Sequence, residues 1–298
     1  MMTPDILTPR HWADYELIDS GGFEKLERFG GYTLRRPEPQ AIWLKSLPET
    51  EWRRLADCTF RRQAHADERG EWQCRAGLPE AWFVGYRYKE MSLRMRLGLT
   101  AFKHVGLFPE QAENWNFIYD STRRIAAETG SAPQVLNLFA YTGGASLAVR
   151  AAGAAVTHVD SVKQVVGWAR ENMEASGLED IRWIVDDAMK FVQREVRRGQ
   201  RYEGIILDPP AYGRGPNGEK WVLEEQFSEL LGLCAQLLAP GASFLVLNLY
   251  SMGFSSLLAK GAVNQRFGNA REEQFGELCF SDRAGKMLPL GVFYRFFR

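Results

Sequence analysis

The chain has 298 residues, 45% of them hydrophobic, which is enough to bury the core of one large domain or two. Lysine plus arginine and aspartate plus glutamate each number 37, so nucleic-acid binding through overall positive charge is excluded and only a local basic patch could serve it. The four cysteines lack metal-ligand spacing, so we expect reduced cysteines and no metal. No apolar run approaches the ~20 residues of a membrane span, and no signal-peptide pattern is present, so we expect a cytoplasmic protein.

Residues 1–105 predict a small β-rich accessory domain that could bind substrate or RNA. Glycine-containing turns separate short apolar or alternating segments, as in antiparallel strands. Residues 48–57 suit a short helix with proline in its first turn. The clearest strands are expected at 15–18, 23–29, 32–34, 81–88 and 91–97.

The end of this segment is rich in basic and aromatic residues. The basic residues Arg87, Lys89, Arg94, Arg96 and Lys103 stand among Tyr86, Tyr88 and Phe102, with only Glu90 opposing them. Such interleaving suits a nucleic-acid strand, through phosphate contacts and base stacking. The alternative is a solvated sheet face whose other side belongs to the core. We take Arg94 and Arg96 as candidate substrate-binding residues.

From residue 106 to 298, apolar strands alternate with amphipathic helices joined by short connections. This alternation predicts a parallel, doubly wound sheet with its ligand crevice at the carboxyl ends of the strands. The final two strands are joined only by a loop, so we expect an antiparallel pair to close the sheet. Strands are expected at 134–139, 155–160, 181–185, 203–208, 243–249, 274–281 and 292–297.

A glycine turn follows the first of these strands. The apolar run 135–139 leads into Tyr141, Thr142, Gly143 and Gly144, and a small-residue helix begins there. Glycine lets the backbone approach a ligand, and the N–H groups of the first helical turn face it. The turn predicts a nucleotide-type site. A nicotinamide dehydrogenase would require a third glycine in the Gly-x-Gly-x-x-Gly spacing, which is absent.

Aspartates end the second and third predicted strands. Asp160 is placed to accept both hydroxyls of a ribose, and Asp187 to accept a hydrogen bond from an adenine amino group. For either residue the alternative is a helix N-cap, where aspartate is also favoured. Their occurrence at successive strand ends favours an adenosine site.

The fourth strand ends in the sequence Asp208-Pro209-Pro210-Ala211-Tyr212. Two prolines cannot continue the strand ladder and they fix the backbone, so Asp208 is held extended at the strand tip. Its carboxylate can accept a hydrogen bond from a substrate, and Tyr212 can stack on a planar one. The alternative is a plain strand-ending turn. Residues 213–218 are glycine-rich, and we expect a mobile loop that closes over substrate.

These stretches resemble a known family. The run 137–144, Asp160, Asp187 and Asp208-Pro209-Pro210 are similar to the bacterial large-subunit ribosomal RNA methyltransferases that modify cytosine C5 or guanine N7. The segment 106–111 resembles that family's loop before the catalytic domain, and the match covers about residues 80–298. The resemblance implies an α/β, Rossmann-like, seven-stranded class I methyltransferase fold with a small N-terminal β-rich (α+β) domain. It also implies S-adenosylmethionine as cofactor.

The resemblance also implies residue roles. Cofactor binding would fall to Phe108, Gln111, Asn137, Phe139, Tyr141, Thr142, Gly143, Gly144, Asp160, Ser161, Asp187, Ala188 and Asp208. Asp208, Pro209, Pro210 and Tyr212 would form the catalytic loop, with Asn248 and Tyr250 lining the substrate pocket.

One departure from the family changes the expected chemistry. The cytosine-C5 members need a nucleophilic cysteine just after the fifth strand, but residues 247–253 contain none. Cys234 and Cys279 fall within predicted elements, as core residues do. We therefore expect direct methyl transfer to a nitrogen or oxygen, with RNA as the favoured substrate. The alternatives are a small molecule or protein side chain as substrate, and a non-catalytic RNA-binding or assembly protein that retains a cofactor site.

Overall fold

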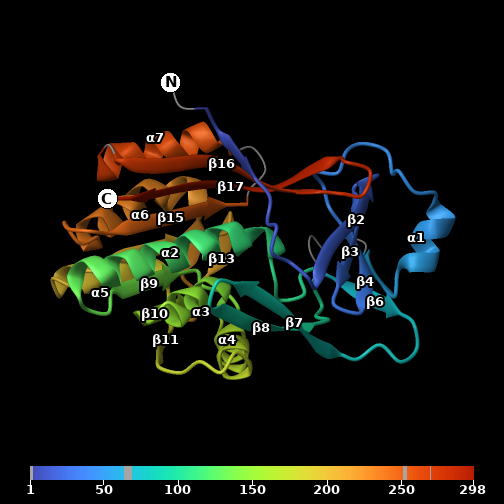
Figure 1. Cartoon of the computed structure of the whole chain (residues 1–298), viewed down its shortest axis with the longest axis horizontal. Coiled ribbons are helices and arrows are strands. Elements are labelled where there is room, and N and C mark those ends of the chain that lie inside the picture. The colour runs from blue at the N-terminus through green and yellow to red at the C-terminus, as the bar shows by residue number, and fades with distance from the viewer. Residues whose placement is uncertain (1–2, 64–68, 251–253, 269) are drawn as a thin grey trace. The chain divides into compact units, whose positions relative to one another are not determined.

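The computed structural model describes residues 3–63, 69–250, 254–268 and 270–298 (Figure 1). The chain divides into two units, which take segments from both ends of the sequence. These two units do not coincide with the predicted domains, which are residues 1–105 and 106–298. The first unit comprises Met1–Leu7, Gln111–Leu278 and Gly291–Arg298, and the second comprises Thr8–Glu110 and Cys279–Leu290.

The first unit is built on an eight-stranded sheet in the order β1-β16-β17-β15-β12-β9-β10-β11. The neighbours from β15 to β11 are parallel, and β17 runs antiparallel to β15. The predicted Rossmann-like α/β fold is confirmed, and β1 adds an eighth strand by pairing in parallel with β16. The strands are β1 (Asp5–Leu7), β9 (Gln134–Leu138), β10 (Ala155–Asp160), β11 (Ile181–Val185), β12 (Gly204–Leu207), β15 (Phe244–Leu249), β16 (Glu272–Ser281) and β17 (Met287–Phe297).

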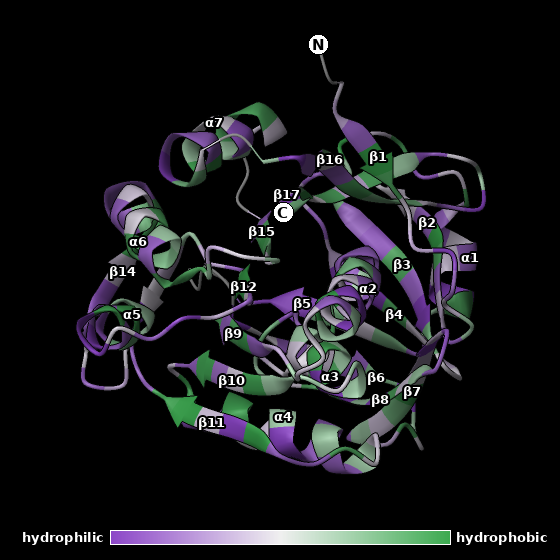
Figure 2. Cartoon of the chain, turned by 60° about the vertical axis from the view of Figure 1, so that its left-hand side comes forward, coloured by the Kyte–Doolittle hydropathy of each residue, from purple (hydrophilic) through white to green (hydrophobic). Residues whose placement is uncertain are grey.

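Helices cover both faces of this sheet. Figure 2 shows α2, α3 and α4 on one side and α5, α6 and α7 on the other. Every residue of the central strands β12 and β15 is buried, which explains why these strands are continuous apolar runs rather than alternating ones. The helices are α2 (Ala112–Thr129), α3 (Gly144–Ala151), α4 (Lys163–Ala175), α5 (Ala188–Arg197), α6 (Leu223–Leu237) and α7 (Ser256–Phe267), with a 3-10 turn at Pro109–Gln111. Among the described residues, no helix has both the length and the apolar character needed to cross a membrane.

The second unit is β-rich, as predicted. Its five-stranded sheet has the order β2-β3-β4-β5-β6, and a separate hairpin pairs β7 with β8. The elements are β2 (Tyr15–Gly21), β3 (Glu24–Phe29), β4 (Tyr32–Pro37), α1 (Glu49–Leu55), β5 (Cys58–Arg62), β6 (Gly70–Cys74), β7 (Ala81–Tyr88) and β8 (Met91–Gly98).

Two of the four cysteines are joined in this unit. Cys58 and Cys74 lie directly opposite each other on the antiparallel strands β5 and β6 and form a disulfide. The expectation of four reduced cysteines is therefore wrong for this pair, because no local pattern indicated that the two strands would be neighbours. Cys234 and Cys279 are free and buried, in agreement with their assignment to the core.

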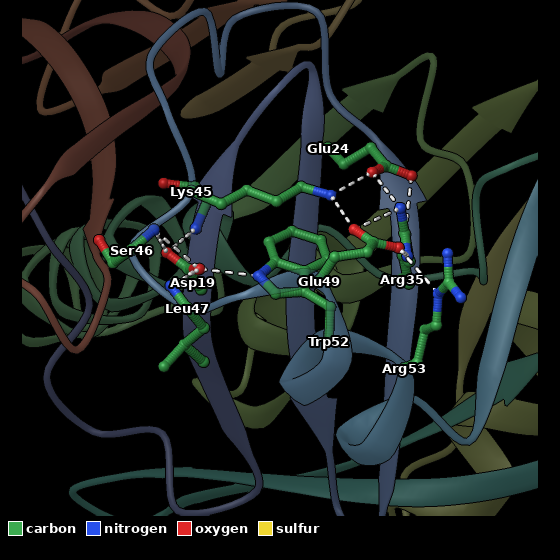
Figure 3. Close-up of polar contacts among 10 residues, drawn as sticks. Asp19, Glu24, Arg35, Lys45, Ser46, Leu47, Glu49, Trp52 and Arg53 are labelled. Atoms are coloured by element: carbon green, nitrogen blue, oxygen red, sulfur yellow. Dashed lines mark hydrogen bonds and ion pairs between the residues drawn. The ribbon is translucent and has the colours of Figure 1, made fainter.

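A buried carboxylate fixes the start of α1 (Figure 3). The register of β2 shifts between Leu17 and Asp19, and the Asp19 side chain is only 1% exposed. It accepts hydrogen bonds from the backbone N–H of Leu47 (2.9 Å) and the indole of Trp52 (2.8 Å), and from the Lys286 ammonium (2.9 Å). Burial opposes ionisation of Asp19, but these bonds outweigh it and hold its pKa below the usual value.

Replacing Asp19 by asparagine should therefore destabilise the protein by roughly 2–4 kcal/mol at neutral pH, because the partly buried Lys286 ammonium loses a negatively charged partner and an NH2 group replaces one of the two accepting oxygens. Since the folded-state pKa of Asp19 is lowered, its contribution is present above the unfolded-state pKa and is lost as the pH falls through the folded value. Urea unfolding at neutral pH and in acid measures both effects, and the difference between wild type and Asp19→Asn should shrink in acid. Glu51→Gln, which removes a bond to Arg54 from a largely solvated side chain on α1, should leave stability close to the wild-type value. Equal stability of Asp19→Asn and wild type would contradict this account.

Candidate functional site

The carboxyl ends of five adjacent parallel strands meet at one edge of the large sheet. The order β15-β12-β9-β10-β11 places the segments that follow these strands side by side. The predicted residues at strand ends are therefore neighbours along that edge: the 139–144 turn after β9, Asp160 and Ser161 at β10, Asp187 after β11, Asp208 after β12, and Asn248 and Tyr250 at β15.

The turn after β9 has a strained backbone. Phe139 and Tyr141 adopt left-handed conformations with φ of 55° and 49°, and Gly143 has φ of 91°. Such conformations cost residues other than glycine about 1–2 kcal/mol each, and they concentrate at ligand sites. Gly143 is the N-cap of α3, so the free N–H groups of that helix begin here.

A tryptophan packs directly beneath the turn. A Cβ added at Gly144 would overlap the indole of Trp115, a residue of α2 that is only 4% exposed. Position 144 therefore requires glycine if the first turn of α3 is to stay where it is. The sequence pattern indicated the glycine but not its partner, because Trp115 is distant in sequence.

Asp160 ties this turn to the neighbouring strand. Its carboxylate accepts hydrogen bonds from the backbone N–H of Tyr141 (2.9 Å) and of Val162 (2.9 Å). Burial raises the pKa of Asp160, although these bonds oppose the increase. The N-cap of α4 is Val162, so Asp160 does not occupy the capping position.

Asp187 does occupy a capping position. It is the N-cap of α5, and its carboxylate accepts a hydrogen bond from the backbone N–H of Lys190 (2.9 Å). Ala188 follows as the first, buried residue of α5. The capping interpretation of this aspartate is therefore correct, and adenine recognition by Asp187 stays a proposal.

Two exposed valines lie at the same edge of the sheet, and the sequence pattern did not single them out. Val162 follows β10 and Val185 ends β11, and they are 46% and 41% exposed. Asp160 and Val185 are paired in the register of the two strands. Exposed branched side chains beside a carboxylate offer apolar contact to a planar group, and only the strand register reveals this.

A buried polar network supports the turn from within. The Asn137 amide donates to Ser146 Oγ (2.9 Å), and that oxygen lies 3.0 Å from His158 Nδ1. Burial lowers the pKa of His158 to about 3, so its imidazole is neutral. The side chain of Asn137, predicted to bind cofactor, is thus 2% exposed and engaged inside the fold.

Asp208 and Asn248 form a hydrogen-bonded pair at the ends of β12 and β15. Leu207 and Leu247 are paired in the register of β12 and β15, so Asp208 and Asn248 come next along their strands. The Asn248 amide donates to Asp208 Oδ1 (2.7 Å). Burial raises the pKa of Asp208 to about 6, and the bond from Asn248 lowers it. This carboxylate titrates close to neutrality, as a group that takes up a proton during a reaction does.

Trp221 connects the two sides of the site. Its indole N–H donates to the Pro210 carbonyl (2.7 Å), and its ring centroid lies 4.9 Å from that of Phe139. The loop expected at residues 213–218 lies in part within an antiparallel ribbon of β13 (Tyr212–Arg214) and β14 (Lys220–Val222). The loop prediction is wrong for residues 213 and 214, which belong to β13, whereas residues 215–218 connect the two strands. Trp221 of β14 is 3% exposed, and its burial anchors the ribbon.

The remaining predicted site residues differ in exposure, in hydrogen bonding and in the unit to which they belong. Tyr212 is 52% exposed, and the Thr142 carbonyl accepts a hydrogen bond from Asn172 (2.9 Å). Gln111 accepts one from Asn114 (2.9 Å) at the start of α2. Phe108, Arg94 and Arg96 belong to the second unit rather than the first. Of the segment after β15, residues 251–253 lie outside the described part of the chain. The described residues contain no group of three or more His, Cys, Asp or Glu side chains that could hold a metal ion.

Comparison with known proteins yields curated relatives. The ribosomal RNA large subunit methyltransferase K/L of Shewanella frigidimarina is 30% identical over 164 residues, which cover 54% of this chain and 22% of that protein. The ribosomal RNA large subunit methyltransferase I of Aeromonas salmonicida is 28% identical over 187 residues, covering 58% and 42%. The chain thus spans less than half the length of these relatives. The predicted resemblance to bacterial large-subunit ribosomal RNA methyltransferases is confirmed.

Solved structures and a family model complete the comparison. The crystal structure of a SAM-dependent methyltransferase from Agrobacterium tumefaciens superposes with a TM-score of 0.89 at 38% identity, covering 99% of this chain and 94% of that one. A putative methyltransferase from Streptococcus mutans shares the fold, with a TM-score of 0.70 at 15% identity and coverage of 97% and 76%. The model of the S-adenosylmethionine-dependent methyltransferase family matches residues 44–274. The chain belongs to this family, and its cofactor is S-adenosylmethionine.

Proposed function

We propose that this protein methylates RNA by direct transfer of a methyl group to a nitrogen or oxygen. The observation that carries the proposal is the Asp208–Asn248 pair at the end of β12 and β15, next to the strained turn after β9. We also propose that it acts in the cytoplasm.

The residues at the sheet edge fit the cofactor. The turn 141–144 and the N–H groups of α3 suit the methionine part, because a helix N-terminus favours a carboxylate. Asp160 would accept the ribose hydroxyls, with Ser161 beside it, while Asp187 and Ala188 would contact the adenine. Val162 and Val185 would pack against the ring, since both are exposed at this edge.

When bound, the cofactor supplies a methyl group already activated by the sulfonium, so the protein mainly has to position the acceptor and exclude water. Asp208 has one carboxylate oxygen engaged by Asn248, and the other would face the acceptor. A nitrogen or hydroxyl oxygen that bears hydrogen would donate to it, and Asp208 would take up the proton released on methylation. Pro209 and Pro210 would hold this carboxylate, and Tyr212 would stack on a planar substrate, with Tyr250 lining the same end of β15.

RNA is favoured as substrate by the names of the relatives, which are ribosomal RNA methyltransferases. A cysteine-dependent attack on a pyrimidine is disfavoured, because residues 247–253 contain no cysteine and the free cysteines Cys234 and Cys279 are buried. The zero net charge favours a second candidate, a small molecule or protein side chain.

Incubating the protein with methyl-labelled S-adenosylmethionine and extract from cells lacking it tests this function. Label should enter the RNA fraction and vanish on ribonuclease treatment, and Asp208→Asn should reduce incorporation roughly 10²–10⁴-fold. Label in protein or small metabolites would instead support the second candidate. Cofactor binding without label in any fraction would support a non-catalytic RNA-binding or assembly role.

The Asp208–Asn248 bond makes a separate prediction about pH. Methyl transfer needs the Asp208 carboxylate, so activity should fall as the pH drops through its pKa of about 6. Replacing Asn248 by leucine removes a hydrogen bond that lowers this pKa, so the acidic limb of kcat/KM should move to higher pH. Rates between pH 5 and 9, measured with the RNA fraction that gains label, test the shift. Gln193→Leu, which removes a bond to Glu229 on α6, is the control. An unshifted limb in Asn248→Leu would refute the role of the bond.

A further inference from the structure

The β7–β8 hairpin of the second unit carries an unusual concentration of positive charge. Its two strands, Ala81–Tyr88 and Met91–Gly98, contain no acidic residue. They contain three arginines, in a chain whose net charge is zero. Local positive charge of this kind attracts a polyanion, although the whole protein does not.

Strand alternation separates these arginines from the core. The inward residues of β7 and β8 are buried, and Tyr86 among them is 0% exposed. Of the aromatic residues predicted to stack on bases, Tyr86 is therefore a core residue. The outward side chains are Phe83, Arg87, Ser92, Arg94 and Arg96, which with Gly85 form what we call the outer face of the hairpin. The solvated-face interpretation describes this packing correctly, and it is compatible with binding on the outer side.

Phe83 is the aromatic residue on the outer face, and the sequence pattern did not single it out. Its ring is 40% exposed although it is large and apolar. The register places Phe83 opposite Arg96 and Gly85 opposite Arg94, and the Arg94 guanidinium lies 4.7 Å from the Phe83 ring centroid. Gly85 contributes no side chain between Phe83 and Arg87. The result is an exposed ring with the Arg94 guanidinium over it, next to a backbone N–H of Gly85 that donates to the Asp14 carboxylate (2.7 Å).

We propose that the outer face of the β7–β8 hairpin binds an unpaired stretch of RNA, with Phe83 stacking on a base and Arg87, Arg94 and Arg96 contacting phosphates. The inference rests on the proposed function in taking RNA as the partner. The exposed ring selects an unpaired strand, because bases within a duplex are already stacked on each other. An acidic protein could contact the arginines, but it would offer no base to stack on the exposed Phe83 ring.

Stacking and phosphate binding differ in their salt dependence, and this difference provides the test. The probe is a fluorescently labelled single-stranded RNA of about twelve nucleotides, titrated at several salt concentrations without cofactor. Phe83→Leu keeps an apolar side chain but removes the ring, so it should weaken binding roughly 5- to 100-fold with the salt slope unchanged. Arg94→Gln with Arg96→Gln should reduce the slope of log affinity against log salt by roughly 1.4, about 0.7 for each phosphate that is no longer neutralised.

Control variants distinguish RNA binding at the outer face of the hairpin from general effects of mutation on charge or folding. Arg53 is an exposed arginine on α1 outside the hairpin, and Arg53→Gln should leave affinity and slope at wild-type values. Phe83→Tyr retains the ring and should bind as the wild type does. The same RNA annealed to its complement should bind more weakly than the single strand. Circular dichroism and titration with S-adenosylhomocysteine should show that each variant is folded and binds cofactor.

The outcomes distinguish this proposal from the proposed function. Wild-type affinity in Phe83→Leu and in the double arginine variant, while RNA still gains methyl label, would overturn the hairpin surface and leave the function standing. No binding of the probe by the wild type would also overturn the surface, and the labelling experiment would decide the function separately. Displacement of the probe by polyglutamate as readily as by unlabelled RNA, without an effect of Phe83→Leu, would point to an acidic protein and contradict the proposal.

Discussion

The strained turn between Phe139 and Gly143 is the constraint on which the rest of the site depends. Its left-handed residues persist because surrounding groups hold them: the Asp160 carboxylate accepts from the Tyr141 N–H, and Trp115 packs under Gly144. The free N–H groups of α3 begin at this turn. The conformation of this turn thus places the N–H groups of a helix beside a carboxylate at the edge of a parallel sheet. The N–H groups can bind the charged part of a nucleoside-containing cofactor, and the carboxylate can bind its ribose.

The same sheet edge organises the residues that we propose to bind the methyl acceptor. Because β12 lies between β9 and β15, Asp208 faces Asn248 on one side and comes close to the turn on the other. Trp221 reinforces this arrangement, since it bonds the Pro210 carbonyl and contacts the Phe139 ring. A partly buried carboxylate with a pKa of about 6, beside the turn proposed to hold the methyl donor, is suited to an acceptor that loses a proton.

Local patterns predicted the elements well, and the contacts between distant segments could not be predicted from them. The alternation of strands and helices indicated the doubly wound sheet, and the placement of Asp160 and Asp208 at strand ends follows from that topology. The Cys58–Cys74 disulfide and the packing of Trp115 against Gly144 depend on which segments meet in space. The exposure of a side chain could not be predicted from the sequence either. Only the strand register shows that Phe83 faces outward and that the neighbouring arginines lie on the same face.

The central claim, that the turn after β9 holds the cofactor, is tested most directly by calorimetric titration with S-adenosylhomocysteine of the wild type, Gly144→Ala and Gly167→Ala. An alanine at 144 must displace Trp115, whereas nothing lies within 4 Å of a Cβ added at Gly167 on α4. The account predicts that wild type and Gly167→Ala bind equally and that Gly144→Ala, still folded, binds at least about tenfold more weakly. No binding by the wild type, or wild-type affinity in Gly144→Ala, would contradict it.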